Sequence, residues 1–305
     1  MATAEKSRTK SSGPPTKKTG GAKKAAPKPK GRRARAEAKQ KARTAKLRAR
    51  AGSRWRIHYD IDGPRVRLGI AWFVGAVIAF TVGLVGIVLY FGVAFGAAGS
   101  HCLRTWRAAG RDVDPTVALG SVAVVVTLAA FGPKLMGLGV LALAGFAVAV
   151  SLGGRDDEDT PTVSMANVGL VLQSALPPAV AGGCVILLAD REVWSAIALV
   201  LLVSAYESGD YLVGSGAANS VEGPLAGAAG VLVVSMAVAA GGFPPFDVGE
   251  ALLFGLLVAP LALGGQYLAT AMLPHSRAFA PALRRVDSLL LAAPVWYFGI
   301  DTFVS

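Results

Sequence analysis

The feature that most constrains this 305-residue chain is a series of long apolar runs that contain almost no charged residues. A helix of about 20 apolar residues crosses the roughly 30 Å hydrocarbon core of a bilayer. A transmembrane barrel would alternate apolar and polar residues, whereas these runs are apolar on every face. The runs lie between charged breaks and cover residues 68–98, 116–131, 135–152, 168–188, 193–206, 224–241, 249–272 and 287–304. We therefore expect an all-α, polytopic transmembrane helical bundle.

Charge divides the chain at Arg67. Residues 1–67 hold 22 Lys and Arg against four acidic residues, a net charge of +18, whereas residues 68–305 hold nine against 15, a net of −6. The first part has too few large apolar side chains to offset the entropy of ordering, and no apolar stretch that would make it a secretory signal. The pattern predicts a disordered, basic cytoplasmic tail (1–67) attached to a polytopic membrane domain (68–305).

The basic tail has three interpretations. It could act only by fixing the topology of the chain. It could also contact anionic lipid headgroups, which attract each nearby Lys or Arg by about 1 kcal/mol. Nucleic acid is a third partner for such charge, but the only aromatic residues of the tail are Trp55 and Tyr59, so we do not expect nucleic-acid binding.

The first apolar run decides the orientation of every later loop. Residues 68–98 would span about 46 Å as one helix, so they form either a single tilted span or a hairpin broken near Gly83 to Gly86. The positive-inside rule favours the hairpin, because a single span would place the Arg104 loop outside and invert all later loops. With the hairpin, the loops on the cytoplasmic side hold most of the loop Lys and Arg; they are the Arg104 loop and residues 153–167, 207–223 and 273–286. We expect about nine spans in the cell membrane, with a cytoplasmic N-terminus.

Three polar clusters interrupt the membrane domain. The first, residues 155–159, is an acidic run that we interpret as a solvated loop. The second gathers Glu207, Asp210 and Glu222 where a span ends, and carboxylates at a membrane boundary are candidates for a site. Their hard oxygen ligands suit Mg²⁺, although the same segment could simply cap two helices.

The third cluster opens the final span. Its guanidinium groups, on Arg277, Arg284 and Arg285, suit recognition of phosphate. Asp287 and Ser288 follow them and would also serve as an ordinary helix N-terminus. The cluster is therefore a candidate phosphate site with a purely structural alternative.

Segments in the second and third clusters together resemble a known family. They read ESGDYLVGS at 207–215, NSVEG at 219–223 and RRVDSLL at 284–290, and the Arg-rich segment 103–111 fits the same layout. In this order, near the C-terminus, they resemble the signature segments of the phosphatidate cytidylyltransferases, also called CDP-diacylglycerol synthases. The likeness in layout covers roughly residues 68–305, and the motifs themselves begin at Glu207.

The resemblance implies an activity and a site. The family transfers CMP from CTP to phosphatidate, forming CDP-diacylglycerol and releasing pyrophosphate, with Mg²⁺ as cofactor. Carried over by position, the catalytic residues are Glu207, Glu222 and Asp287, and the metal ligands are Glu207 and Asp287. The substrate- and phosphate-binding residues implied in the same way are Ser220, Arg277, Arg284, Arg285 and Ser288. The expected partners are phosphatidate and CTP, and a homodimer is a further expectation.

Several positions depart from the family pattern. Glu207 stands where the family has Asp, Ser215 where it has Arg, and Asn219 where it has Lys. Residues 192–276 contain no Lys or Arg, although a phosphate-handling enzyme needs cations at its site. The alternative hypothesis is therefore a catalytically inactive, family-derived membrane protein that binds lipid or a protein partner. An unrelated transporter or scaffold is the third hypothesis.

Overall fold

The computed structural model describes residues 65–153, 161–217, 219–242 and 244–303. The predicted disordered tail and the acidic run at 155–159 lie outside the described residues, as does all of the first compact unit of the chain, Met1–Ala42. The helices described below all belong to the second unit, Arg43–Ser305.

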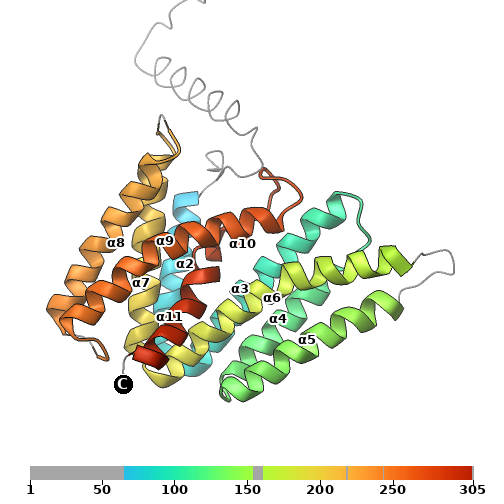
Figure 1. Ribbon diagram of the computed structural model, residues 1–305, viewed down its shortest axis with the longest axis horizontal. Coiled ribbons are helices and arrows are strands. Elements are labelled where there is room, and N and C mark those ends of the chain that lie inside the picture. The colour runs from blue at the N-terminus through green and yellow to red at the C-terminus, as the bar shows by residue number, and fades with distance from the viewer. Residues whose placement is uncertain (1–64, 154–160, 218, 243, 304–305) are drawn as a thin grey trace, which may run out of the picture. The chain divides into compact units, whose positions relative to one another are not determined.

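The described residues form helices joined by turns, with no strand among them (Figure 1). This confirms the all-α prediction. The helices are α2 (Arg65–Val82), α3 (Leu84–Ala108), α4 (Pro115–Ala129), α5 (Pro133–Gly153), α6 (Pro161–Arg191), α7 (Val193–Gly214), α8 (Glu222–Gly241), α9 (Val248–Met272), α10 (Leu283–Val286) and α11 (Leu289–Phe303).

Within the described ranges, six helices are long and apolar enough to cross a membrane: α3, α5, α6, α7, α8 and α9. Two shorter apolar helices are formed by Gly69–Val82 of α2 and by the whole of α4. Many large apolar side chains on these helices are exposed, as the lipid-facing surface of a membrane protein requires. The protein is therefore a multi-pass integral membrane protein, and the predicted polytopic bundle is confirmed.

The first apolar run is a hairpin. It breaks at Gly83, whose φ of +91° is a conformation that only glycine adopts without strain. The chain then folds back, because the hydroxyl of Tyr90 in α3 donates a 2.6 Å hydrogen bond to the carbonyl of Trp72 in α2. The two rings also meet edge to face, with centroids 5.7 Å apart. The predicted hairpin is confirmed.

The helices pack as two neighbouring groups. In the N-terminal group, α3, α4 and α6 pack against one another, and α5 packs on α4 and α6 (Figure 1). In the C-terminal group, α7 packs on α8, α8 on α9, and α9 on α11, with the short α10 against α3 and α9. Helix α6 also touches α7 and α11, so it joins the two groups. Helix α2 packs on α3 and reaches α7.

One predicted boundary is wrong. The span expected at 193–206 with a polar loop after it is instead a continuous helix, α7, that runs to Gly214. Ionisable residues within membrane helices face the bundle interior or a cavity, as Glu207 and Asp210 do here, so they need not end a span. Gly209 within this stretch allows close packing, because a Cβ there would press on the backbone of Ala226 in α8. The carboxylates therefore lie on a helix.

The Arg-rich loop after the hairpin is likewise shorter than expected. Helix α3 continues to Ala108, so Arg104 and Arg107 lie on its last turns. The following helix starts at a well-defined cap, where Asp114 accepts a 2.9 Å hydrogen bond from the backbone N–H of Thr116 and Pro115 occupies the first helical position.

Candidate functional site

A cavity of about 540 Å³ opens among α2, α7, α9 and the α10–α11 turn. Its volume lies within the 300–1,000 Å³ range that is typical of small-molecule sites. Its lining combines a polar part, from α7, α9 and α10, with an apolar part, from α2, α3 and the end of α7. One ligand in the cavity could therefore contact both charged and apolar side chains.

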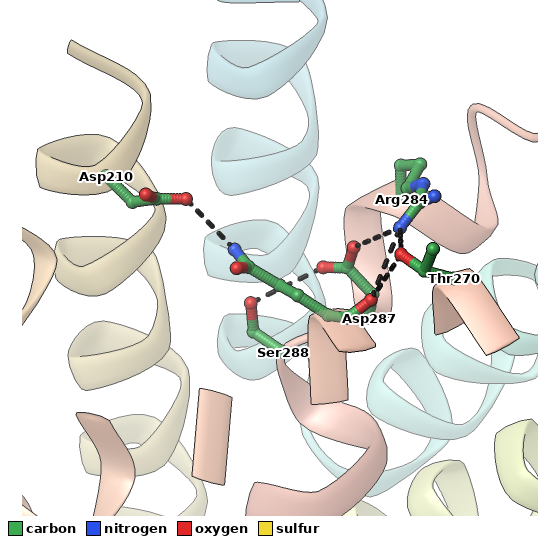
Figure 2. Close-up of polar contacts among 6 residues, drawn as sticks. Asp210, Thr270, Arg284, Asp287 and Ser288 are labelled. Carbon is green, nitrogen blue, oxygen red and sulfur yellow. Dashed lines mark hydrogen bonds and ion pairs between the residues drawn. The ribbon is translucent and has the colours of Figure 1, made fainter. Parts of the chain in front are cut away.

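On the α7 side, the polar part is built around Asp210, whose residue is only 3% exposed. Its Oδ2 accepts a 3.1 Å hydrogen bond from Nε2 of Gln266 in α9. In Figure 2 the Asp210 carboxylate extends from α7 toward the cluster formed by α9 and the α10–α11 turn. This side-chain contact links α7 to α9 and joins residues that are 56 positions apart in the sequence.

On the opposite side, Arg284 is held by three neighbours. Its Nη1 donates a 2.8 Å hydrogen bond to the hydroxyl of Thr270 and lies 3.6 Å from Oδ2 of Asp287. A longer contact, 3.4 Å, reaches the carbonyl of Gln266. The side chains of Arg284 and Asp287 are only 15% and 6% exposed, so this ion pair is largely shielded from solvent. Figure 2 shows Arg284, Thr270 and Asp287 in contact.

The second guanidinium points elsewhere. Arg285 also lines the cavity, and its Nη1 lies 3.1 Å from the position that a Cβ on Gly69 of α2 would occupy. Successive residues of the one-turn helix α10 therefore send their cations to different walls, Arg284 toward α9 and Arg285 toward α2. Arg284 and Arg285 of α10 are the two cations in the cavity lining. Helices α7 and α9 contribute none, because residues 192–276 contain no Lys or Arg.

Close approach of α9 to the α10–α11 turn depends on Gly265. A Cβ at this position would collide with the carbonyl oxygen of Asp287. The glycine therefore lets the turn sit directly on α9, which brings Asp287 beside Arg284 and places Thr270 within reach of the same guanidinium.

The end of α9 is fixed by side chains from the N-terminal group. Nε1 of Trp106 donates a 2.8 Å hydrogen bond to the carbonyl of Met272, and Nε2 of Gln173 donates one of 3.2 Å to the carbonyl of Ala271. The last carbonyls of a helix have no partner inside the helix, and leaving them unpaired in a membrane is costly. These donors therefore hold α9 where Gln266 faces the cavity.

The loop after α9 has a similar anchor. Nδ1 of His101 in α3 accepts a 3.2 Å hydrogen bond from the backbone N–H of Ala282, directly before α10. Together with the Trp106 bond, it places the ends of α3 and α9 and the start of α10 at one end of the bundle. Two of the segments that the positive-inside rule assigned to one side, the Arg104 segment and residues 273–286, thus share that end, while the side of the membrane they face stays a prediction.

The apolar wall opens toward the lipid-facing surface. Ile70 and Phe73 of α2 and Leu212 of α7 line the cavity and are 60%, 42% and 71% exposed. Trp72 and Tyr90 lie behind them and line the cavity as well. Exposed apolar side chains at the opening allow an apolar part of a ligand to leave sideways between α2 and α7.

The structure brings together five of the residues singled out from the sequence. Glu207, Asp210, Arg284, Arg285 and Asp287 all line the cavity. Ser288 is fully buried beside them, with its hydroxyl 3.4 Å from Oδ1 of Asp287. Residues of the second and third clusters therefore line one cavity.

Glu222, Ser220 and Arg277 are not among the lining residues. Glu222 stands in the first turn of α8, where its Oε1 accepts a 2.8 Å hydrogen bond from Nδ2 of Asn219. Oδ1 of Asn219 in turn accepts from the backbone N–H groups of Val221 and Glu222. This local pattern satisfies the start of α8, so the structure supports the capping alternative for this part of the second cluster. Ser220 and Arg277 are exposed.

The predicted metal ligands can be compared with this geometry. Glu207 and Asp287 face the same cavity, and Mg²⁺ in nucleotide sites is held by one or two carboxylates together with substrate phosphates. Among the residues that the structure describes, no group of three or more His, Cys, Asp or Glu could hold a metal ion by itself. Any Mg²⁺ would therefore depend on these two carboxylates and on the phosphates of its substrate.

Two polar residues of this site, Gln266 and Thr270, were not among the sequence candidates, whereas Asp210 was one of the three carboxylates of the second cluster. Asp210 lies three residues after Glu207, a spacing that places both on one face of a helix once the segment is known to be helical. Gln266 and Thr270 lie four residues apart within the otherwise apolar α9. Polar residues inside a membrane helix are themselves the signal that could have identified them.

Comparisons with known proteins leave the family open. No protein-family model matches the chain, and neither the curated proteins nor the solved structures contain a match. The resemblance to the phosphatidate cytidylyltransferases thus stays a hypothesis, and the chemistry of the cavity is inferred from its own residues.

Proposed function

We propose that this integral membrane protein binds a phospholipid, with the phosphate at Arg285 and the acyl chains leaving between α2 and α7. The observation that carries the proposal is the composition of one cavity, which joins a buried ionic cluster to an exposed apolar wall. Ionisable residues within the helices of a membrane protein are expensive to keep and mark functional sites by default.

The arginine side chains of the cavity are suited to bind the phosphate of such a lipid. A guanidinium binds phosphate through two parallel hydrogen bonds, which gives both energy and orientation. Arg284 is already engaged by Asp287 and Thr270, so its main role is to position the α10–α11 turn. The Arg285 guanidinium lies at the α2 wall, on the side of the cavity where its apolar lining is exposed, so we assign it the direct contact with the phosphate.

The apolar wall of the cavity is suited to contact the acyl chains of the lipid. A soluble ligand would gain little from exposed Ile70, Phe73 and Leu212, because those side chains face lipid in any case. An acyl chain that follows them stays in the hydrocarbon while its headgroup reaches the polar part. A cavity of about 540 Å³ thus needs to enclose only the headgroup and its nearest atoms.

The test is native mass spectrometry of the full-length protein in detergent, titrated with dioleoyl phosphatidate or with dioleoylglycerol, which lacks the phosphate. We expect phosphatidate adducts to form at lower lipid concentration. Arg285→Gln should weaken them about tenfold to a hundredfold, because a charged hydrogen bond is worth about 1.5–3 kcal/mol. The matched control is Arg277→Gln, which removes an exposed guanidinium outside the cavity and should leave binding unchanged. Equal binding of both lipids, or no effect of Arg285→Gln, would contradict the proposal.

A second candidate function is cytidylyl transfer, favoured by the presence of Glu207 and Asp287 in the same cavity as both arginines. The phosphatidate oxygen would attack the α-phosphorus of CTP, the bond to the β-phosphate would break, and pyrophosphate would leave. Glu207 and Asp287 would hold Mg²⁺, which neutralises charge on the phosphates.

This second function is tested in membranes supplied with CTP, phosphatidate and Mg²⁺. CDP-diacylglycerol formed by the parent protein and lost in Asp287→Ala would support it. A matched Glu222→Ala variant should keep its activity, because Glu222 pairs with Asn219 outside the cavity. Absence of product from the parent protein would leave lipid binding as the function.

A further inference from the structure

The Asp210–Gln266 pair leaves one atom without a partner. Gln266 is only 5% exposed, and its Nε2 donates to Asp210. Among the described residues, nothing donates a hydrogen bond to its buried Oε1. A buried polar atom without a partner is costly, more so in a membrane where water cannot compensate.

The orientation of this amide follows from its neighbour. A carboxylate can only accept hydrogen bonds, so the amide of Gln266 must turn its NH₂ group toward Asp210. Turning the amide over would face Oε1 with the carboxylate and leave the NH₂ group unsatisfied instead. The unpaired acceptor is thus imposed by Asp210.

The cavity as a whole is rich in acceptors. Its lining holds three carboxylates, from Glu207, Asp210 and Asp287, against two guanidinium groups. A ligand that offers only phosphate oxygens would add acceptors to this surface and leave Gln266 Oε1 unpaired. A phosphate monoester carries up to two negative charges and a phosphodiester carries one. The monoester therefore suits this acceptor-rich cavity less well than the phosphodiester.

We infer that the site selects phosphodiester lipids whose headgroup carries a hydrogen-bond donor, a hydroxyl or an ammonium, which binds Oε1 of Gln266 and the neighbouring Asp210. The inference rests on the proposed lipid binding and names the class of lipid. Oε1 is covered by the surrounding side chains, so the donor reaches it after a small rotation of the terminal amide torsion, which is broad and soft. Arg285 holds the phosphate, and the donor-bearing end of the headgroup lies against α7 and α9.

The experiment compares four dioleoyl lipids on the full-length protein by native mass spectrometry: phosphatidylglycerol, phosphatidylethanolamine, phosphatidylcholine and phosphatidate. The first two carry a donor beyond the phosphodiester. Phosphatidylcholine has the phosphodiester and no donor, and phosphatidate is the monoester. We expect at least one donor-bearing lipid to bind about tenfold more tightly than phosphatidylcholine and phosphatidate. Which of the two does so identifies the donor as a hydroxyl or an ammonium.

Two variants assign the preference to one residue. Gln266→Met keeps the length of the side chain and removes the acceptor, so the ratio of donor-bearing lipid to phosphatidylcholine should fall to about one. Ser235→Ala is the control, because it removes a buried hydroxyl of α8 that bonds to the carbonyl of Val231 and lies outside the cavity lining. It should keep the ratio of the parent protein. If Gln266→Met does not fold, the four-lipid comparison on the parent protein still decides.

The outcomes separate this inference from the proposed function. Binding that depends on Arg285 but is equal for all four lipids would overturn the donor selection and leave lipid binding intact. Tighter binding of phosphatidate or phosphatidylcholine than of both donor-bearing lipids would also overturn it. Binding of no phospholipid above dioleoylglycerol would overturn both.

Discussion

The two groups of helices face the same membrane but fill their interiors differently. The N-terminal group packs apolar side chains of different sizes, such as Phe95, Ala98 and Val122, all with no exposure. Its buried Ser174 bonds to the sulfur of Cys102 within the same core. Residues of this kind serve packing, since small residues and weak polar contacts are how membrane helices associate.

The C-terminal group instead buries residues that are costly in a membrane. Asp210, Gln266, Thr270 and Asp287 are each no more than 5% exposed and meet at one cavity. Apolar residues at these positions would serve packing as well as they do in the N-terminal group. The N-terminal group shows that membrane helices can pack without buried ionisable groups. The buried polar residues of the C-terminal group therefore mark it as the candidate for ligand binding.

The largest expected effect comes from separating the Arg284–Asp287 pair. Asp287→Ala leaves a largely buried guanidinium without its carboxylate, and breaking such a pair costs about 3–5 kcal/mol of unfolding free energy. The double variant Arg284→Met/Asp287→Ala should recover much of that loss, because no uncompensated charge remains. Thermal unfolding of both variants in detergent measures this. A double variant as unstable as the single one would show that the pair contributes through packing and not through charge.

The next effect concerns the close approach of α9 to the α10–α11 turn. Gly265→Ala places a methyl group against the carbonyl of Asp287, and overpacking of this kind costs about 1–3 kcal/mol. In the N-terminal group, Gly137→Ala on α5 is the matched control, since a Cβ there meets nothing within 4 Å. It should be neutral or slightly stabilising, as alanine is the better helix former. Equal melting temperatures for the two variants would contradict the proposed packing at Gly265.

A smaller effect is expected where the two groups are joined. Trp106→Phe removes the donor to the Met272 carbonyl and should cost about 1–2 kcal/mol, within the 1–3 kcal/mol penalty of an unsatisfied buried group. Trp194→Phe on α7, where the ring is 43% exposed, is the control and should change stability little. Because the bond positions the end of α9, Trp106→Phe should also weaken phosphatidate binding, which native mass spectrometry measures. Unchanged lipid binding would show that α9 is held by its remaining contacts.

Much of the fold could be predicted because its signals are local. Apolar runs of helical length indicate spans whatever they pack against, and a glycine-rich break within an overlong run indicates a turn, as Gly83 shows. The end of the span predicted before Glu207 is wrong because a charged residue does not by itself end a membrane helix. Whether a carboxylate ends a helix or faces an interior cavity depends on the neighbouring helices, which the local sequence does not contain.

The site was harder to predict for the same reason. Asn219 and Glu222 are three residues apart, so their pairing at the start of α8 is a local event that the capping interpretation included. The contact of Asp210 with Gln266 and that of Arg284 with Thr270 join residues 56 and 14 positions apart, and each depends on how α9 packs. Gln266 also lies outside the segments 207–215, 219–223 and 284–290 that carry the family resemblance, so the motifs do not point to it.

The smallest expected effect lies in the N-terminal group and involves no ligand. The backbone N–H of Thr116 donates to the Asp114 carboxylate and holds its pKa below the ordinary value of 3.8. A depressed pKa stabilises the folded state above that ordinary value, and the contribution is lost as the pH falls through the folded-state pKa. Asp114→Ala should therefore cost about 1 kcal/mol at neutral pH, as loss of a helix cap does, and progressively less below about pH 4. Asp114→Asn keeps the cap but cannot titrate, so its stability relative to the parent should rise as the pH falls. Melting temperatures at pH 7 and pH 3.5 measure this difference, and because Asp114 lies outside the cavity, lipid binding should be the same in all three proteins.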